Sequence, residues 1–170
     1  MSMELIEQLK ADGRAKGLCR MWQMKLKKGL PLPQLVGLYV RGIDFCISED
    51  YPTLDFLREN FKGQCEPYGV YIDDVVETSN KPDTVLNGDC KAFLSYDGFA
   101  VGRAFIRHNS KAAVNVSGHA VLTIDIFDNS HVSVAVSGWD AKVDVNVYGR
   151  ASVVCIGHGI TVNKTNKNTY

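Results

Sequence analysis

Four histidines and two aspartates are the residues of this sequence best suited to acid–base catalysis or metal binding. All of them follow residue 90: His108, His119, His131 and His158, with Asp128 and Asp140. A neutral imidazole can act as a general base or bind a metal ion, and a carboxylate can supply a general acid or a second ligand. All six lie at or beside positions that we interpret below as corners between strands. What chemistry they could perform therefore depends on which corners the fold brings together.

A second group of residues could bind a sugar or pack against a partner. Thr123, Asp125 and Phe127 alternate along one segment, and Asp144, Asn146 and Tyr148 alternate along another. Aromatic rings beside small polar groups on a flat β-face can stack on sugar rings, but they also pack against a protein surface. A carbohydrate-active site would need a carboxylate pair, whereas Asp125 and Asp144 fall out of register. We favour packing as the role of these aromatic residues.

A repeat of twenty residues must position these groups. Branched or aromatic side chains recur two residues apart in four copies: Leu94 and Tyr96, Val114 and Val116, Val134 and Val136, and Val154 and Ile156. Turns recur as Asp97-Gly98, Ser117-Gly118 and Ser137-Gly138, and again as His108-Asn109, Asp128-Asn129 and Tyr148-Gly149. Asn and Gly tolerate left-handed backbone angles, so these positions read as corners. In the third copy the second strand is shifted by one residue, which we interpret as a deletion near Trp139-Asp140.

The repeat predicts a short β-solenoid of about twenty residues per coil. The alternative is an antiparallel β-meander or sandwich, with a strand about every ten residues. We favour the solenoid because the equivalence holds better at twenty residues than at ten. Stacked coils would place corners of adjacent coils about 5 Å apart. Only His108 and Asp128 then form a sensible pair, because His119 and His131 fall over Trp139 and Ala151. Solvated corner residues are the interpretation that we prefer, so we predict no catalytic residue, metal ion or cofactor.

The first half of the chain has a different composition. Residues 1–90 contain 11 of the 13 leucines and all five prolines, which favours helices. Leu5, Leu9, Leu18, Trp22 and Leu26 form one apolar stripe that ends at the prolines after Gly29, and further helices are expected over 34–45 and from Pro52-Thr53 to Gly63. The predicted organisation is α+β: a helical part at 1–63, a connection at 64–89, solenoid repeats at 90–162 and a polar tail at 163–170.

Composition and charge limit the function classes. The 19 basic and 19 acidic residues cancel, which argues against a protein that mainly coats nucleic acid or an anionic membrane. Five scattered cysteines without a C-x-x-C pair are typical of reduced thiols in a cytoplasmic protein rather than a disulfide framework or a zinc site. The first ten residues do not have the pattern of a secretory signal, and no early apolar stretch is long enough to span a bilayer.

Three segments carry a resemblance to known sequences: LYVRGIDFCISEDYPTLDF, FKGQCEPYGVY and VLNGDCKA, the last followed by the valine repeat. With them the chain resembles a family of uncharacterised small proteins from gut bacteria and their phages and prophages, which implies a C-terminal valine-rich β-solenoid and no particular activity. A looser similarity to bactofilins does not extend to their single-domain layout, so it implies no polymerisation here.

These observations favour a non-enzymatic structural or interaction protein that presents a rigid solenoid face and self-associates as a homo-oligomer. The expected partner is a second copy or another protein, without membrane or nucleic acid. The candidate interaction surface comprises Phe127, Trp139, Tyr148, His108 and Asp128. One alternative is a phage virion component such as a fibre or adaptor, which would place the protein in the virion instead of the cytoplasm. Another is a carbohydrate-binding or carbohydrate-active β-helix protein.

Overall fold

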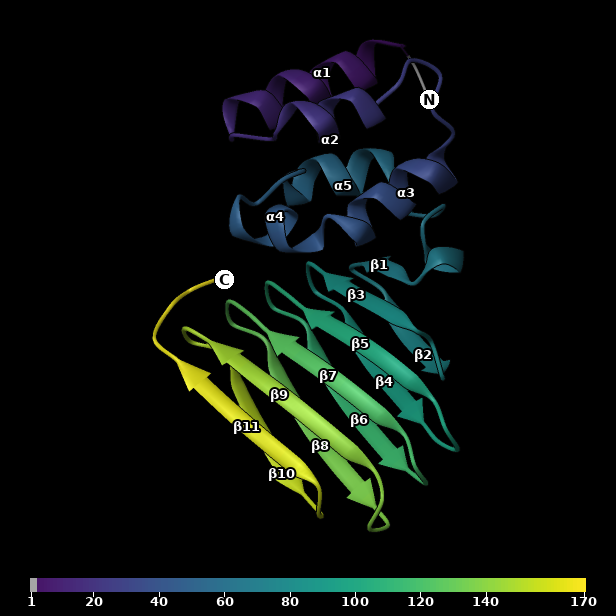
Figure 1. Cartoon of the computed structure of the whole chain (residues 1–170), viewed down its shortest axis with the longest axis vertical. Coiled ribbons are helices and arrows are strands. Elements are labelled where there is room, and N and C mark those ends of the chain that lie inside the picture. The colour runs from purple at the N-terminus through teal and green to yellow at the C-terminus, as the bar shows by residue number, and fades with distance from the viewer. Residues whose placement is uncertain (1–2) are drawn as a thin grey trace. The chain divides into compact units, whose positions relative to one another are not determined.

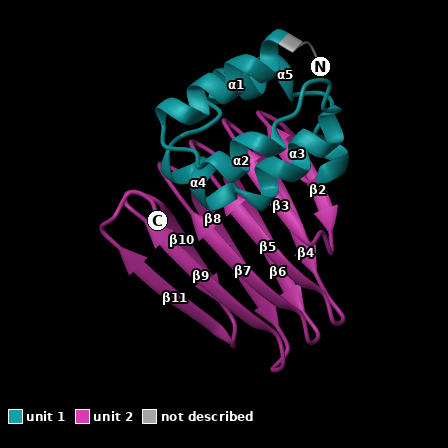
Figure 2. Ribbon diagram, turned by 45° about the horizontal axis from the view of Figure 1, so that its top comes forward, with its two compact units in different colours: residues 1–68, 170 teal, residues 69–169 magenta. Residues whose placement is uncertain are grey.

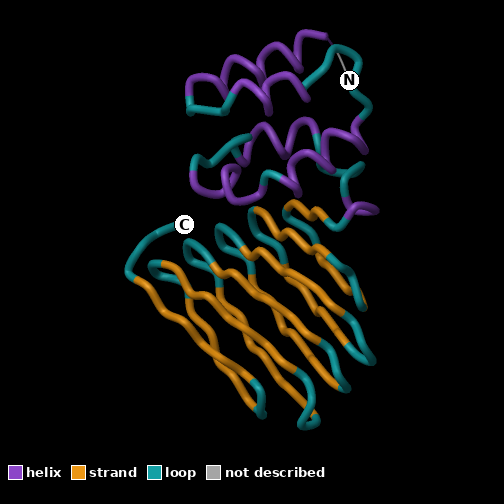
Figure 3. Tube along the Cα trace, in the orientation of Figure 1, coloured by secondary structure: helices purple, strands orange, loops and turns teal. Residues whose placement is uncertain are grey.

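The protein forms a helical unit and a β unit. The computed structural model describes residues 3–170, and the chain divides into one unit of residues 1–68 with Tyr170 and another of residues 69–169 (Figure 2). The change from helix to strand in Figure 3 coincides with this division. The prediction of a helical first part followed by a β-solenoid is confirmed.

Within residues 3–68 the helical unit contains five short helices. They are α1 (Met3–Ala15), α2 (Arg20–Lys25), α3 (Leu32–Arg41), α4 (Ile43–Ser48) and α5 (Leu54–Asn60), followed by a single 3-10 turn at Glu66–Tyr68. The first expected helix is two helices, because Gly17 adopts a φ of 89° that ends α1. The second is likewise divided, at Gly42. The third is confirmed as α5: the Thr53 hydroxyl caps it by accepting a hydrogen bond from the Phe56 N–H, 3.3 Å away.

The apolar stripes of these helices form the core of the helical unit. Ile6, Val36 and Leu57 are fully buried. Tyr51 is also buried, and its hydroxyl donates a hydrogen bond to the Leu9 carbonyl oxygen at 2.7 Å. This bond satisfies the only polar atom of the Tyr51 side chain, so the ring can be buried without leaving an unpaired donor.

The β unit is a solenoid of two parallel sheets. Strands alternate between the sheets, so that one has the order β1-β3-β5-β7-β9-β11 and the other β10-β8-β6-β4-β2 (Figure 1). Every pairing between strands is parallel, which excludes the antiparallel meander. The bounds are β1 Val70–Ile72, β2 Val75–Ser79, β3 Asp83–Asn87, β4 Lys91–Tyr96, β5 Val101–Ile106, β6 Lys111–Ser117, β7 Val121–Ile126, β8 His131–Ser137, β9 Lys142–Tyr148, β10 Ser152–Ile156 and β11 Ile160–Thr165.

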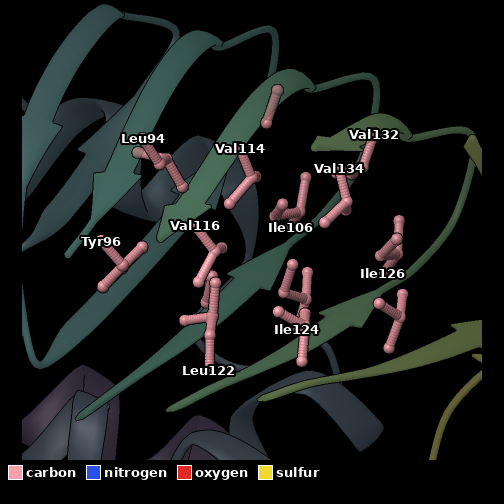
Figure 4. Close-up of a cluster of buried hydrophobic side chains, with 14 of the residues drawn as sticks. Leu94, Tyr96, Ile106, Val114, Val116, Leu122, Ile124, Ile126, Val132 and Val134 are labelled. Carbon is pink, nitrogen blue, oxygen red and sulfur yellow. The ribbon is translucent and has the colours of Figure 1, made fainter. Parts of the chain in front are cut away.

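Alternation along each strand builds the solenoid core. Residues at every second position point between the sheets, as the side chains of Leu94, Val114, Val134, Ile124 and Ile126 show in Figure 4. Each stacks on its equivalent in the next coil: Leu94 pairs with Val114, and Val114 with Val134. One coil cannot bury its own apolar face, whereas neighbouring coils cover each other, and this is why the pattern has to repeat.

The irregularity near Trp139-Asp140 is an insertion, so the predicted deletion is wrong. Val121 pairs with Lys142 and His131 pairs with Ser152, which makes this spacing 21 residues instead of 20. Because of the extra residue, the side chains of the last copy that a period of twenty predicts to face inward face outward instead. Val154 and Ile156 therefore lie on the outer face, and Val153 and Cys155 take the inward positions opposite Val132 and Val134.

The solenoid is also longer than the repeat indicated. Residues 64–89, expected to be a connection, contain β1, β2 and β3, which pair with β3, β4 and β5. Their spacing to the next coil is irregular: Val70 pairs with Val85 and Val75 with Lys91, which a search at twenty residues does not detect. At the other end β11 continues through Thr165, so the polar tail begins at Asn166 and not at residue 163.

Candidate functional site

The predicted pair of His108 and Asp128 lies on adjacent coils, but the two side chains bond to backbone groups. The Asp128 carboxylate accepts a hydrogen bond from the His108 N–H at 2.8 Å, and His108 Nδ1 accepts one from the Gly88 N–H at 2.9 Å. Both residues adopt left-handed φ angles, 63° and 60°. The same corner position is occupied by Gly88 and Gly149 in neighbouring coils, with φ angles of 76° and 57°. The arrangement stabilises successive corners and leaves no acid and base facing a common substrate.

The aromatic pair of Phe127 and Tyr148 also forms, 21 residues apart. The two rings stack with their centroids 4.6 Å apart and 14° between their planes. The sequence predicts that Phe127 belongs to the interaction surface. Its side chain is only 1% exposed, so it cannot contribute to an accessible surface. Its ring packs on Tyr148 instead.

The polar residues expected beside these rings do not form a carboxylate pair. Asp125 is buried and accepts a hydrogen bond from Asn146 Nδ2 at 2.7 Å. Asp144 pairs in register with Thr123 on the neighbouring strand, so the carboxylates of Asp125 and Asp144 occupy different columns. Two carboxylates flanking one substrate bond, the requirement for glycoside hydrolysis, are not provided by these residues.

Trp139 belongs to a row of rings at one corner of successive coils. Its side chain is 79% exposed and stacks on His158, with ring centroids 4.1 Å apart. At the equivalent corner of earlier coils, Phe99 stacks on His119 at 4.8 Å. His119 Nδ1 lies 3.7 Å from Asp140 Oδ2. Each imidazole at this edge thus contacts a ring, and that of His119 also lies near a carboxylate. In residues 3–170 no group of three or more His, Cys, Asp or Glu side chains could hold a metal ion.

The last coil presents the most distinctive surface of the solenoid. β10 pairs with β8 on one side, and β11 pairs with β9 on one side; no other described strand pairs with either. On β10, Val154 is 54% and Ile156 is 71% exposed. The backbone N–H and C=O groups along an unpaired parallel edge can accept a further strand. The sequence signal for this surface is the apolar run Val153-Val154-Cys155-Ile156. A period of twenty predicts that Val154 and Ile156 face inward, whereas the structure places them outward.

The two edge strands differ in charge. β10 has the sequence SVVCI and contains no ionisable residue except Cys155, whereas β11 has the sequence ITVNKT. Lys164 stands in register with the inward Val147, and an ammonium at such a position opposes pairing with another apolar edge. Burial raises the pKa of the Cys155 thiol, an effect that the nearby Lys164 opposes, so Cys155 acts as a neutral apolar side chain. β10 is therefore the edge better suited to pairing.

Comparisons with known proteins identify no relative. No protein-family model matches the chain, and neither the curated proteins nor the solved structures contain a match. Among the helices of residues 3–170, none is long and apolar enough to cross a membrane.

Proposed function

We propose that the protein is a structural component that forms a homodimer by pairing β10 with β10 of a second copy. The observation that supports this function is the unpaired, uncharged edge of β10 with its exposed valine and isoleucine. In this role the solenoid is a rigid spacer, and the helical unit of each copy is available for other contacts.

The strand is complementary to itself. If a two-fold axis passes beside Val154, the two β10 strands run antiparallel and Val154 faces Val154 of the second copy. Inward Cys155 then lies opposite inward Val153, so the two solenoid cores become continuous across the interface. An interface made by the same patch on both copies is what two-fold symmetry requires, and it closes without further growth. A partner of different sequence would have to reproduce this inward and outward alternation.

The first test is the mass of the protein in solution. Light scattering coupled to size exclusion should give twice the chain mass of 18.8 kDa. Val154→Lys should shift the protein to the monomer, because it places an ammonium on the symmetry axis beside its own copy. The matched control is Val101→Lys, at a 69% exposed valine on the outer face of β5, which should remain dimeric. Circular dichroism verifies that both variants are folded.

The second test examines the register. In a Cys19→Ser background, which removes the exposed native thiol, Val154→Cys should form a disulfide between two chains under mild oxidation. Residues directly opposite in an antiparallel pair have Cα atoms about 4.5–5.5 Å apart, within the range that a disulfide can bridge. Val101→Cys should stay reduced. A mass of one chain at every concentration, or a dimer that Val154→Lys leaves intact, refutes this function; a trimer would instead favour the virion component.

A further inference from the structure

The helical unit contains a cavity that its own side chains do not fill. Its volume is about 360 Å³, which is at the lower end of the range for small-molecule sites. Leu9, Leu18, Trp22, Leu35, Phe45 and Phe61 line it, so its walls come from α1, α2, α3 and α4 and from the end of α5. The break between α1 and α2 at Gly17 places Leu18 and Trp22 on the wall, since an uninterrupted helix would continue past this point.

Most of the side chains that line the cavity are apolar. Tyr51 contributes a buried hydroxyl to its wall, and this hydroxyl already donates to the Leu9 carbonyl oxygen. Burial raises the pKa of this hydroxyl strongly, which fits an apolar environment. A ligand that enters would therefore gain from transfer of hydrocarbon out of water, at about 0.8 kcal/mol for each buried methylene group.

The rim of the cavity carries charge that the protein does not neutralise. Arg41 donates its Nε–H to the Gly37 carbonyl of its own helix, at 3.0 Å, and its terminal nitrogens form no salt bridge with any described carboxylate. The Lys25 ammonium lies 4.1 Å from the ring centroid of Trp22, but Lys25 itself does not line the cavity. Asp44 is the one carboxylate that lines the cavity. The guanidinium of Arg41, which pairs with no described carboxylate, is therefore the group at the rim that can hold a negatively charged head group.

We propose that this cavity binds a small anionic amphiphile, a medium-length alkyl chain with a carboxylate head that Arg41 holds. A guanidinium matches the two oxygens of a carboxylate with two parallel hydrogen bonds. The negative charge of Asp44 should weaken the binding of an anion. Replacing Asp44 with a neutral residue therefore tests whether the head group is negatively charged. The proposal is independent of the dimer described above, because none of its residues lies in the solenoid.

The test uses the emission of Trp22 in the full chain carrying Trp139→Phe, which leaves Trp22 as the only tryptophan. Hexanoate, octanoate and decanoate are titrated below their micelle concentrations. Each added methylene should tighten the dissociation constant about fourfold until the chain fills the cavity. Decanol and decyltrimethylammonium, with the same chain length, should bind more weakly than decanoate.

Variants separate the head group from general charge. Arg41→Gln should weaken decanoate about tenfold and leave decanol unchanged, because hydrogen bonds to a charged group contribute about 1.5 kcal/mol or more. The matched control Arg20→Gln removes the same charge from exposed α2 and should change the affinity for decanoate by less than about twofold. Asp44→Asn should tighten decanoate.

A second readout uses the thiol of Cys19, which lines the cavity and is the exposed cysteine of this unit. Saturating decanoate should slow its alkylation. Equal affinities for hexanoate and decanoate, or no binding of either, would overturn the cavity as a binding site. Tighter binding of the trimethylammonium compound, or an unchanged affinity in Arg41→Gln, would overturn the anionic head group.

Discussion

Replacing Gly102 with alanine tests how the solenoid core is packed. Gly102 lies on β5, in register with Leu122 on β7. A Cβ atom built on Gly102 would be 2.5 Å from Cε1 of Tyr96 and 3.2 Å from Cδ1 of Leu122. Tyr96 is 2% exposed, so its ring has little room to move. The aromatic side chain of one sheet thus occupies the space left by the missing side chain in the other.

Two effects of opposite sign act in Gly102→Ala. A strand glycine replaced by alanine reduces the conformational entropy of the unfolded chain, which stabilises by about 0.4–1 kcal/mol. Overpacking of a close-packed core destabilises by about 1–3 kcal/mol. Because a rigid ring and not a flexible chain end meets the new methyl group, we expect overpacking to dominate. The net loss in the free energy of unfolding should be about 1–2 kcal/mol.

Urea unfolding followed by circular dichroism measures this loss. With a slope of about 2 kcal/mol per molar urea, the midpoint for the solenoid should fall by about 0.5–1 M. In a Tyr96→Leu background the ring is gone, and the same glycine substitution should be nearly neutral, giving a coupling energy of about 1 kcal/mol or more. Gly37→Ala, in α3 with open space around the position, is the control and should stabilise the helical unit. A midpoint for Gly102→Ala at or above that of the original protein would refute the packing argument.

Three further predictions concern the buried hydroxyl, the corners and the thiols. Tyr51→Phe should lower the free energy of unfolding by about 1 kcal/mol at pH 7, measured with urea, through loss of the bond to the Leu9 carbonyl. Burial raises the pKa of Tyr51, so above the ordinary value of about 10 the unfolded chain ionises first and stability falls with rising pH; the fall should be shallower in Tyr51→Phe. Asp128→Ala should destabilise by about 1–2 kcal/mol in thermal melts, because it removes the acceptor for the His108 N–H and puts alanine at φ 60°, which aspartate and asparagine tolerate better. Asp128→Asn should be close to neutral. With a chromogenic thiol reagent Cys19 should react at once, and Cys46, Cys65 and Cys90 should react only on unfolding; rapid reaction of the last three would contradict their burial.

The repeat in the sequence was sufficient to predict the solenoid because its two signals are local. Inward valines such as Val114 and Val134 alternate with small or polar residues, and Gly98 and Gly118 mark the corners with φ angles of 58° and 64°. Each of these preferences acts within a few residues, so it can be recognised without knowing which strands pair. The pairing of His108 with Asp128 followed from the same period.

The insertion beside Trp139 could not be distinguished from a deletion by pattern alone. The apolar residues Val143, Val145 and Val147 are one position out of phase with a period of twenty in either direction, and Val153-Val154 offers an apolar side chain in both phases. Only the observed pairing of Leu122 with Val143 shows a spacing of 21 residues. The first coil was missed for a related reason, since its spacing is irregular and β1 has three residues.

The sequence by itself determined the fold class, the coil length and the corner residues, because backbone preference and alternation are properties of short segments. Only the tertiary structure decided that Phe127 is buried, that Val154 lies outward on an unpaired edge, and that the helices enclose a cavity beside Arg41. Those properties depend on which neighbours a residue has after folding and on which neighbours are missing. At a free edge and in a cavity, neighbouring atoms are missing. The sequence of a single segment does not show which neighbours it will lack after folding.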